Sequence, residues 1–123
     1  KNMSKKIDLF ASIRPANPVT QEPEATIYNW SIHRATYQDG DITDHLMGSI
    51  VGKNGRVTSA VKWLNPVART IITISGRVYQ LSGSPGFSNE ADFIWQTWKN
   101  KHGVINDEEV SVEYEKRITN IIN

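Results

Sequence analysis

Apolar and polar residues alternate in several short segments of this chain, and turn-forming residues separate those segments. In the first segment, Tyr28, Trp30 and Ile32 share one face, and polar residues occupy the other. This period of two is typical of a β-strand that buries one side. We therefore expect a first strand over 27–37, followed by a loop at 38–41.

The middle of the chain continues this pattern and predicts a β-meander. Further strands are expected in runs that alternate or are rich in β-branched residues, namely 46–51, 56–64, 68–74 and 78–81. Turn-forming residues separate these runs: Lys53-Asn54-Gly55, Asn65-Pro66 and Ser75-Gly76. Alternation within 56–64 places Val57, Val61 and Trp63 toward the core, and Arg56, Thr58 and Lys62 toward solvent.

A capping pattern predicts a helix that follows the meander. Ser88 is a favourable N-cap, and Glu90 and Asp92 come in the first turn, where the helix dipole favours negative charge. Gly103 would end the helix after His102. The apolar side of this helix would consist of Phe93, Ile94 and Trp98. Trp95 would either join them or serve as a stacking platform.

The C-terminal segment 108–122 has two possible structures. Val110, Tyr114 and Ile118 recur at helical spacing, whereas Val110, Val112 and Tyr114 also alternate as in a strand. Asp107 resembles a helix N-cap, and the segment is long, so we favour a second helix that begins there.

These elements predict an α+β fold in one domain spanning 1–123. An antiparallel, twisted meander of four or five strands would be covered on one face by one or two C-terminal helices. Residues 1–25 contain three prolines and predict an irregular arm, either a surface lead-in or a docking segment. The expected core comprises Val57, Val61, Trp63, Ile72, Ile74, Tyr79, Leu81, Phe93 and Trp98.

Composition narrows the possible functions. The 123 residues are 38% hydrophobic and 22% charged, which is ordinary for a folded protein, and the net charge is only +1. There is no cysteine, which excludes disulfides and thiolate ligands and favours the cytoplasm. No apolar run reaches the roughly 20 residues that a membrane span requires. We expect Met3 to be the natural start and find no secretory signal behind it.

Charge is distributed unevenly along the chain. The stretch from His45 to Gly83 contains five lysines and arginines and no acidic residue, although the chain has 13 carboxylates. We take four of these cations as candidate binding residues: Arg56, Lys62, Arg69 and Arg77. They could simply be solvated, contact an anionic protein, or contact a nucleic-acid backbone. The small net charge favours a protein partner.

No catalytic or metal motif is present. Asp39, Asp41 and Asp44 resemble a calcium loop but lack its later glycine and terminal glutamate, so a solvated acidic turn is expected. The three histidines, His33, His45 and His102, are far apart and do not form a metal-spacing pair. We therefore predict no cofactor, no metal site and no enzymatic activity.

The pattern Thr58-Ser59-x-Val61, then Ala68-Arg69-Thr70, then Ser75-Gly76-x-x-Tyr79-x-Leu81 resembles a group of small, uncharacterised bacterial and prophage proteins. This resemblance covers the middle third of the chain and implies a prokaryotic mobile-element setting. We predict a small binding protein that inhibits or regulates a protein partner by occluding its surface. The alternative is a nucleic-acid-binding protein that uses the basic sheet face.

Overall fold

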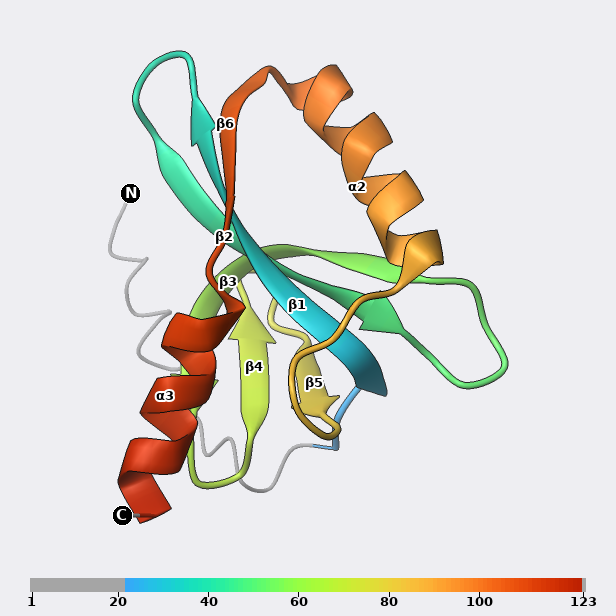
Figure 1. Ribbon diagram of the computed structural model, residues 1–123, viewed down its shortest axis with the longest axis vertical. Coiled ribbons are helices and arrows are strands. Elements are labelled where there is room, and N and C mark those ends of the chain that lie inside the picture. The colour runs from blue at the N-terminus through green and yellow to red at the C-terminus, as the bar shows by residue number, and fades with distance from the viewer. Residues whose placement is uncertain (1–21, 123) are drawn as a thin grey trace.

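The computed structural model describes residues 22–122 and has the mixed α+β architecture that the sequence predicts (Figure 1). Its strands are β1 (Ala25–Tyr37), β2 (Ile42–Ser49), β3 (Arg56–Asn65), β4 (Thr70–Thr73), β5 (Val78–Leu81) and β6 (Val104–Glu109). Its helices are α2 (Asn89–His102) and α3 (Ser111–Ile122). Of the expected arm, only 22–25 are described, and Ala25 already begins β1. No helix among the described residues is long and apolar enough to cross a bilayer.

The first five strands close into a small barrel. Each of β2, β3, β4 and β5 pairs antiparallel with the strand before it, and β5 then pairs with β1. The β5–β1 pairing is parallel, whereas a simple meander has only antiparallel pairs. An up-and-down arrangement with an odd number of strands places its first and last strands in the same direction, so closure through a parallel pair is a geometric necessity.

Strand β1 is central because it pairs with three other strands. Its first residues pair with β5, its last residues pair with β6, and β2 lies along its other side. Between the part of β1 that pairs with β5 and the part that pairs with β6, the loop after β5 bonds to the strand: the Gly86 amide donates to the Trp30 carbonyl. Nearly the whole length of β1 is therefore hydrogen-bonded on both sides.

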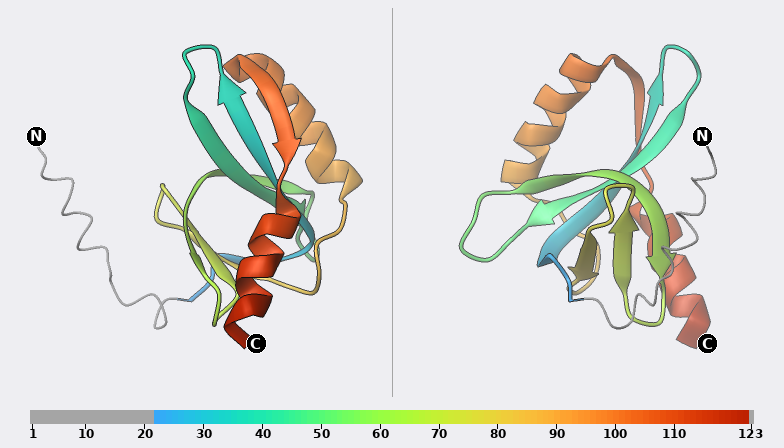
Figure 2. Two further views of the ribbon diagram at one scale, coloured as in Figure 1. Left: turned by 60° about the vertical axis from the view of Figure 1, so that its left-hand side comes forward. Right: turned by 180° about the vertical axis from the view of Figure 1, so that it is seen from behind.

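Two hydrophobic clusters fill the molecule. The barrel cluster is the larger one and contains residues from all five barrel strands and from α3, including Trp30, Leu64 and Ile118. The α2 layer is smaller and joins Ala91 and Trp95 of α2 to the outer face of the sheet. In Figures 1 and 2, α2 and α3 lie at opposite ends of the molecule.

A β-bulge in β1 changes which residues are buried. Tyr28 pairs with Ser49 but Ser31 pairs with Met47, so β1 has one extra residue at this point. Asn29 adopts φ +50°, a left-handed conformation that Asn tolerates better than most residues. Trp30 is buried as predicted, whereas Tyr28 is 37% exposed and the prediction for it was wrong.

Two further bulges occur in β3, opposite β2 and opposite β4. Each extra residue inverts the alternation that follows it. Thr58 is therefore buried, contrary to the prediction, and Trp63 is 45% exposed. Strand β4 buries the face that carries Ile71 instead of the face expected from the sequence, so Ile71 is fully buried and Ile74 is 66% exposed. Of the remaining predicted core on these strands, Tyr79 and Leu81 are buried, and Val57, Val61 and Ile72 are half-buried.

The structure confirms the predicted limits of α2 but not its buried face. The Ser88 hydroxyl accepts a hydrogen bond from the Ala91 amide, and Gly103 ends the helix at φ +69°. Trp95 is fully buried, whereas Phe93 is 74% exposed, so its predicted burial was wrong. Ala91, Trp95 and the half-buried Trp98 recur at helical spacing and form the face that meets the sheet.

The favoured second helix is present from Ser111, and a strand that the sequence did not predict precedes it. Residues 104–109 form β6, which pairs antiparallel with β1, and α3 begins only at Ser111. The prediction that Asp107 caps a helix was wrong, because its carboxylate instead accepts hydrogen bonds from His33, Trp95 and Lys99. The left-handed turn at Gly103 directs the chain back along β1.

The burial of Trp95 and the exposure of Phe93 give a direct test of this packing. Trp95→Ala should lower the free energy of unfolding by about 3–5 kcal/mol, the usual cost of truncating a core aromatic. Phe93→Ala on the same helix should change it by less than about 0.5 kcal/mol. Urea denaturation of both variants measures the difference, and similar losses for the two would contradict the observed helix orientation.

Gly48 tests the bulge in β1, which it faces from β2. A Cβ atom at this position would lie 2.9 Å from the Tyr28 carbonyl oxygen and would also clash with Ile27. Gly48→Ala should therefore destabilise the protein by about 1–3 kcal/mol, as overpacking does. Thr26→Ala, at an exposed position of β1, is the control. Thermal unfolding of both variants provides the readout, and an unchanged melting temperature for Gly48→Ala would contradict the tight contact.

Candidate binding surfaces

The four cations singled out from the sequence do not form one row. Arg56 begins β3, whereas Arg69 follows the end of that strand, beyond the Asn65–Thr70 pair. Arg69 therefore does not lie across from Arg56 or Lys62 in the β3–β4 pair. The exposed Lys62 lies between them, at the β3 bulge beside Trp63.

Each of the three arginines contacts a different part of the chain. The Arg56 Nη1 donates to the Tyr79 hydroxyl at 3.1 Å. The Arg69 Nη2 donates to the Gly83 carbonyl at 2.6 Å, and its Nη1 lies 3.9 Å from the Glu115 carboxylate. The Arg77 Nη1 lies 3.3 Å from the Glu24 carboxylate. Carboxylates from outside the basic stretch thus offset part of its charge, and whether these cations bind a partner stays a prediction.

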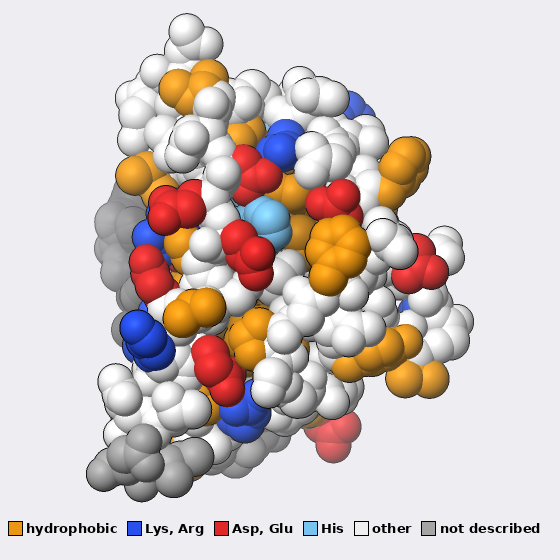
Figure 3. All heavy atoms as spheres, in the orientation of Figure 1, with side chains coloured by type: hydrophobic (Ala, Val, Ile, Leu, Met, Phe, Trp, Pro, Cys, Tyr) orange, Lys and Arg blue, Asp and Glu red, His pale blue; other side chains and the backbone are white. Residues whose placement is uncertain are grey.

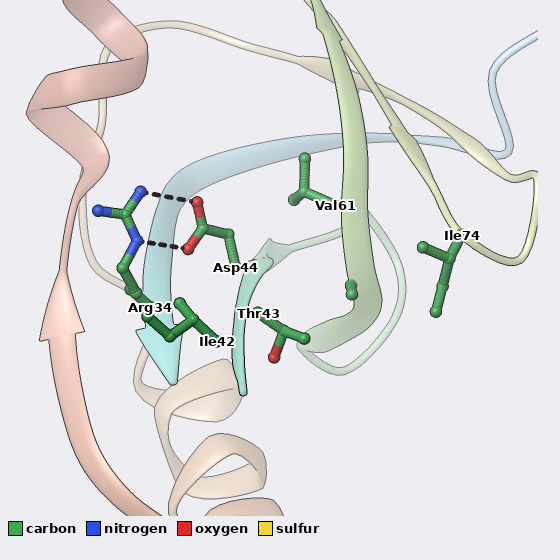
Figure 4. Close-up of a pocket in the computed structure, with 7 residues that line it drawn as sticks. Arg34, Ile42, Thr43, Asp44, Val61 and Ile74 are labelled. Atoms are coloured by element: carbon green, nitrogen blue, oxygen red, sulfur yellow. Dashed lines mark hydrogen bonds and ion pairs between the residues drawn. The ribbon is translucent and has the colours of Figure 1, made fainter. Parts of the chain in front are cut away.

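A groove of about 590 Å³ lies where the β1–β2 hairpin approaches the β4–β5 turn (Figure 4). Its apolar lining consists of Ile42, Ala60, Val61 and Ile74. Ile42 and Ile74 are 58% and 66% exposed, so these two large apolar side chains project from the groove into solvent. Other large apolar side chains of the described residues are equally exposed, but these two line one groove, and neighbouring exposed apolar side chains are what interaction surfaces share.

The opposite side of the groove is polar and tightly bonded. Arg34 and Asp44 are cross-strand partners, and two parallel hydrogen bonds of 2.8 and 3.0 Å join them. Arg34 also donates to Glu113 of α3 at 3.2 and 3.3 Å, and the Tyr114 hydroxyl donates to Asp44 at 2.5 Å. One guanidinium is thus shared by two carboxylates, of which Asp44 lines the groove.

The pKa values of this network follow from its hydrogen bonds. Burial alone would raise the pKa of Asp44, but the hydrogen bonds from Arg34 and Tyr114 outweigh it and lower that pKa. The hydrogen bonds to Asp44 and Glu113 raise the pKa of Arg34 further above its ordinary value. Burial and the bond to Asp44 raise the pKa of Tyr114. All of these groups keep their ordinary charge at neutral pH.

Sequence reasoning missed the groove, although part of it could have been found. In a hairpin centred on Asp39, cross-strand partners lie equally far from Asp39 along the chain, and Arg34 and Asp44 meet this condition. Their opposite charges would then have indicated an ion pair. The exposure of Ile74 had no such signal, because it depends on the bulges in β3.

A second cluster of polar side chains lies beneath α2. His33 Nδ1 donates to Asp107 at 2.8 Å, and the same carboxylate accepts from Trp95 and Lys99 at 3.0 and 2.8 Å. Burial would raise the pKa of Asp107, but these hydrogen bonds lower it overall. Figure 3 shows acidic side chains gathered around a histidine on this face. A carboxylate–imidazole pair can orient a general base, yet no hydrogen bond joins a serine to a histidine within residues 22–122.

The acidic loop before β2 does not gather its carboxylates. The Asp39 carboxylate accepts a hydrogen bond from the Asp41 amide at 3.0 Å, while Asp44 faces Arg34. Over residues 22–122, no group of three or more histidine, aspartate and glutamate side chains is arranged to hold a metal ion.

The lowered pKa of Asp44 predicts acid sensitivity. A carboxylate whose pKa is lower in the folded state contributes stability above its unfolded pKa, and that stability is lost as the pH falls below about 4. Asp44→Asn should lower stability at neutral pH by roughly 1–3 kcal/mol and flatten this acid dependence. Denaturant unfolding across the acid range measures both effects. Asp41→Asn, on an exposed loop, is the control, and equal behaviour of the two variants would contradict the assignment.

Comparison with known proteins does not supply a function. No family model matches the chain, and neither the curated proteins nor the solved structures provide a match. The resemblance to small bacterial and prophage proteins therefore stays a prediction from residues 58–81, and any function has to be argued from the surfaces described above.

Proposed function

We propose that this protein is a non-enzymatic binding protein that inhibits or regulates another protein by occluding its surface. The groove between the β1–β2 hairpin and the β4–β5 turn is the docking site in this proposal. The observation that carries it is the pair of isoleucines, Ile42 and Ile74, that line the groove and are mostly exposed.

The chemistry of the groove favours a protein over other partners. An apolar wall gains free energy by covering aliphatic or aromatic side chains, at about 25 cal/mol per Å² removed from water. The polar wall does not need a ligand to satisfy it, because Arg34 and Asp44 already bond each other. Because Arg34, the cation of the lining, already pairs with Asp44, the groove itself is a poor site for a phosphate backbone. Protein interfaces typically combine such an apolar centre with a charged rim.

One observation supports the alternative of a nucleic-acid-binding protein. Lys62 and Trp63 lie together at the β3 bulge opposite Ile72, and Trp63 is 45% exposed. An exposed aromatic ring beside a lysine is the combination on which single-stranded bases stack. We rank this alternative second because Arg56, Arg69 and Arg77, which would contact the phosphates, bond to groups of this chain.

The cellular setting belongs to the same proposal. A bacterial or phage origin rests on the resemblance of residues 58–81, and a cytoplasmic location rests on the absence of cysteine.

Charged substitutions in the groove test its role. Ile42→Asp combined with Ile74→Asp should abolish capture of a specific host protein from bacterial lysate, detected by mass spectrometry. Because both side chains are exposed, the melting temperature should change little. Val67→Asp is a matched control, since Val67 is 77% exposed and does not line the groove. Capture that survives the double substitution in a folded protein would remove the groove from consideration.

A second experiment separates the protein partner from nucleic acid. Fluorescence anisotropy with mixed DNA and RNA oligonucleotides at two salt concentrations should show weak binding. Tight binding that falls steeply with salt, and that is lost in the Lys62→Glu, Trp63→Ala double variant, would favour the nucleic-acid alternative. Arg56 is left unchanged in this test, because its hydrogen bond to Tyr79 ties it to the fold.

A further inference from the structure

We propose that α2 is an acid-sensitive cover that undocks from the sheet when His45 beneath it takes up a proton, while the barrel stays folded. The proposal does not depend on docking at the groove, although Thr43 and Ala60 adjoin both His45 and the groove. Four observations support it: the convergence of the histidines, the bonding of His45, the local balance of charge and the separation of the two hydrophobic clusters.

All three histidines of the chain converge on two tryptophans of α2. The rings of Trp95 and Trp98 are stacked with centroids 5.3 Å apart. His45 lies 5.5 Å from Trp95 and 4.7 Å from Trp98, while His33 lies 5.5 Å from Trp95. His102 stacks on Trp98 at 4.3 Å. The contact between α2 and the sheet is therefore built from imidazole and indole rings.

His45 is the member of this layer that is buried, with 3% of its surface exposed. Its Nδ1 must donate to the Thr58 carbonyl at 2.9 Å, because a carbonyl oxygen only accepts. Its Nε2 lies 2.8 Å from the Thr43 hydroxyl, which donates to the neutral ring. Thr43 then accepts from the Tyr37 hydroxyl at 2.8 Å. A proton on Nε2 would reverse this chain of hydrogen bonds and place a charge on a buried ring that lies against two indoles.

Burial lowers the pKa of His45 below its ordinary value, although the Thr58 carbonyl and Asp44 oppose this effect. The direction of the pH dependence follows from the linkage between proton binding by His45 and docking of α2. A histidine whose pKa is lower in the docked state binds more protons when it is released, so docking weakens as the pH falls below about 6.5.

Each charged group around this layer bonds a group other than the His45 ring. The titratable groups that face this layer are Lys99 and His102 of α2, His33 and Tyr37 of β1, and Asp107 of β6. Lys99 and Asp107 neutralise each other at 2.8 Å. Glu109 is the cross-strand partner of His33 but accepts from the Ser111 hydroxyl. From β2, Asp44 is bonded to Arg34, and from β3 the neutral Thr58 carbonyl and Ala60 adjoin His45.

Protonation of His45 would therefore add a positive charge to a buried ring whose two hydrogen-bond partners, Thr43 and Thr58, are neutral. Burying a charge that no opposite charge bonds is unfavourable. Undocking of α2 returns this charge to water, because α2 carries the Trp95 and Trp98 rings that lie against His45.

The α2 layer can separate without opening the barrel. Its buried members, Ala35, Met47, Ala91 and Trp95, form a cluster distinct from the barrel cluster. Glycines with positive φ lie at both ends of the segment that carries α2, namely Gly83 and Gly103. Undocking would expose the outer sheet face around Met47 and leave the Trp30 core intact.

Amide hydrogen exchange tests this proposal. Protection of residues 89–102 should fall between about pH 7.5 and pH 5, by up to about tenfold per pH unit for each proton taken up, after correction for the intrinsic exchange rate. Protection of β1 at Trp30 and of β4 should stay unchanged after the same correction. Loss of protection in both regions together, or no loss in α2, would overturn the proposal.

His45→Gln provides the matched variant, because its amide can still donate to the Thr58 carbonyl but does not titrate. It should abolish most of the pH dependence, whereas His102→Gln, at the exposed end of the stack, should leave most of it. An undiminished pH dependence in a folded His45→Gln protein would overturn the role of His45. If that variant does not fold, the His45 ring protons of the native protein decide by NMR. If the His45 ring titrates over the pH range in which α2 loses protection, the proposal is supported. If the ring does not titrate above about pH 5, the proposal is overturned.

Discussion

The rest of this structure depends on the pairing of β1 with three other strands. A straight, evenly pleated strand of 13 residues could not bend from β5 to β6 while staying paired with β2. The bulge at Asn29 provides the bend, and Gly48 provides the space for it on β2. The bend turns Ile27 and Trp30 into the barrel, and beyond it β1 presents alternate faces to the barrel and to α2. Both hydrophobic clusters and the groove depend on this change of direction.

The positions of the elements were predictable from local chemistry, whereas the buried faces were not. Ser88 and Gly103 mark the ends of α2 because capping depends on a few neighbouring residues. Burial of Trp63 and Ile74 was predicted wrongly for a different reason. Alternation assumes an uninterrupted pleat, and a bulge is a property of two paired strands rather than of one segment. The edge strand β6 was missed because its polar residues pair with β1, far away in the chain.

The candidate surfaces show the same division between local and distant information. The basic stretch was visible in the sequence, but Glu24 and Glu115, which partly offset it, come from outside that stretch. The three histidines looked unrelated in the sequence because β1, β2 and α2 bring them together only in the folded chain. In contrast, Arg34 and Asp44 belong to one hairpin, and knowledge of its centre would have paired them.

The parallel closure of the barrel also constrains the order in which the protein can fold. The Ile32 amide donates to the Ser111 hydroxyl, a partner 79 residues later in the chain. During synthesis, β1 emerges long before β5, β6 or α3. Until those elements appear, β1 has no pairing partner from them and can pair only with the early strand β2. Contacts between residues this distant slow folding, since loop-closure entropy is lost before they form. The nascent chain therefore presents an incomplete sheet until α3 has left the ribosome, and folding at that stage depends on protection from aggregation.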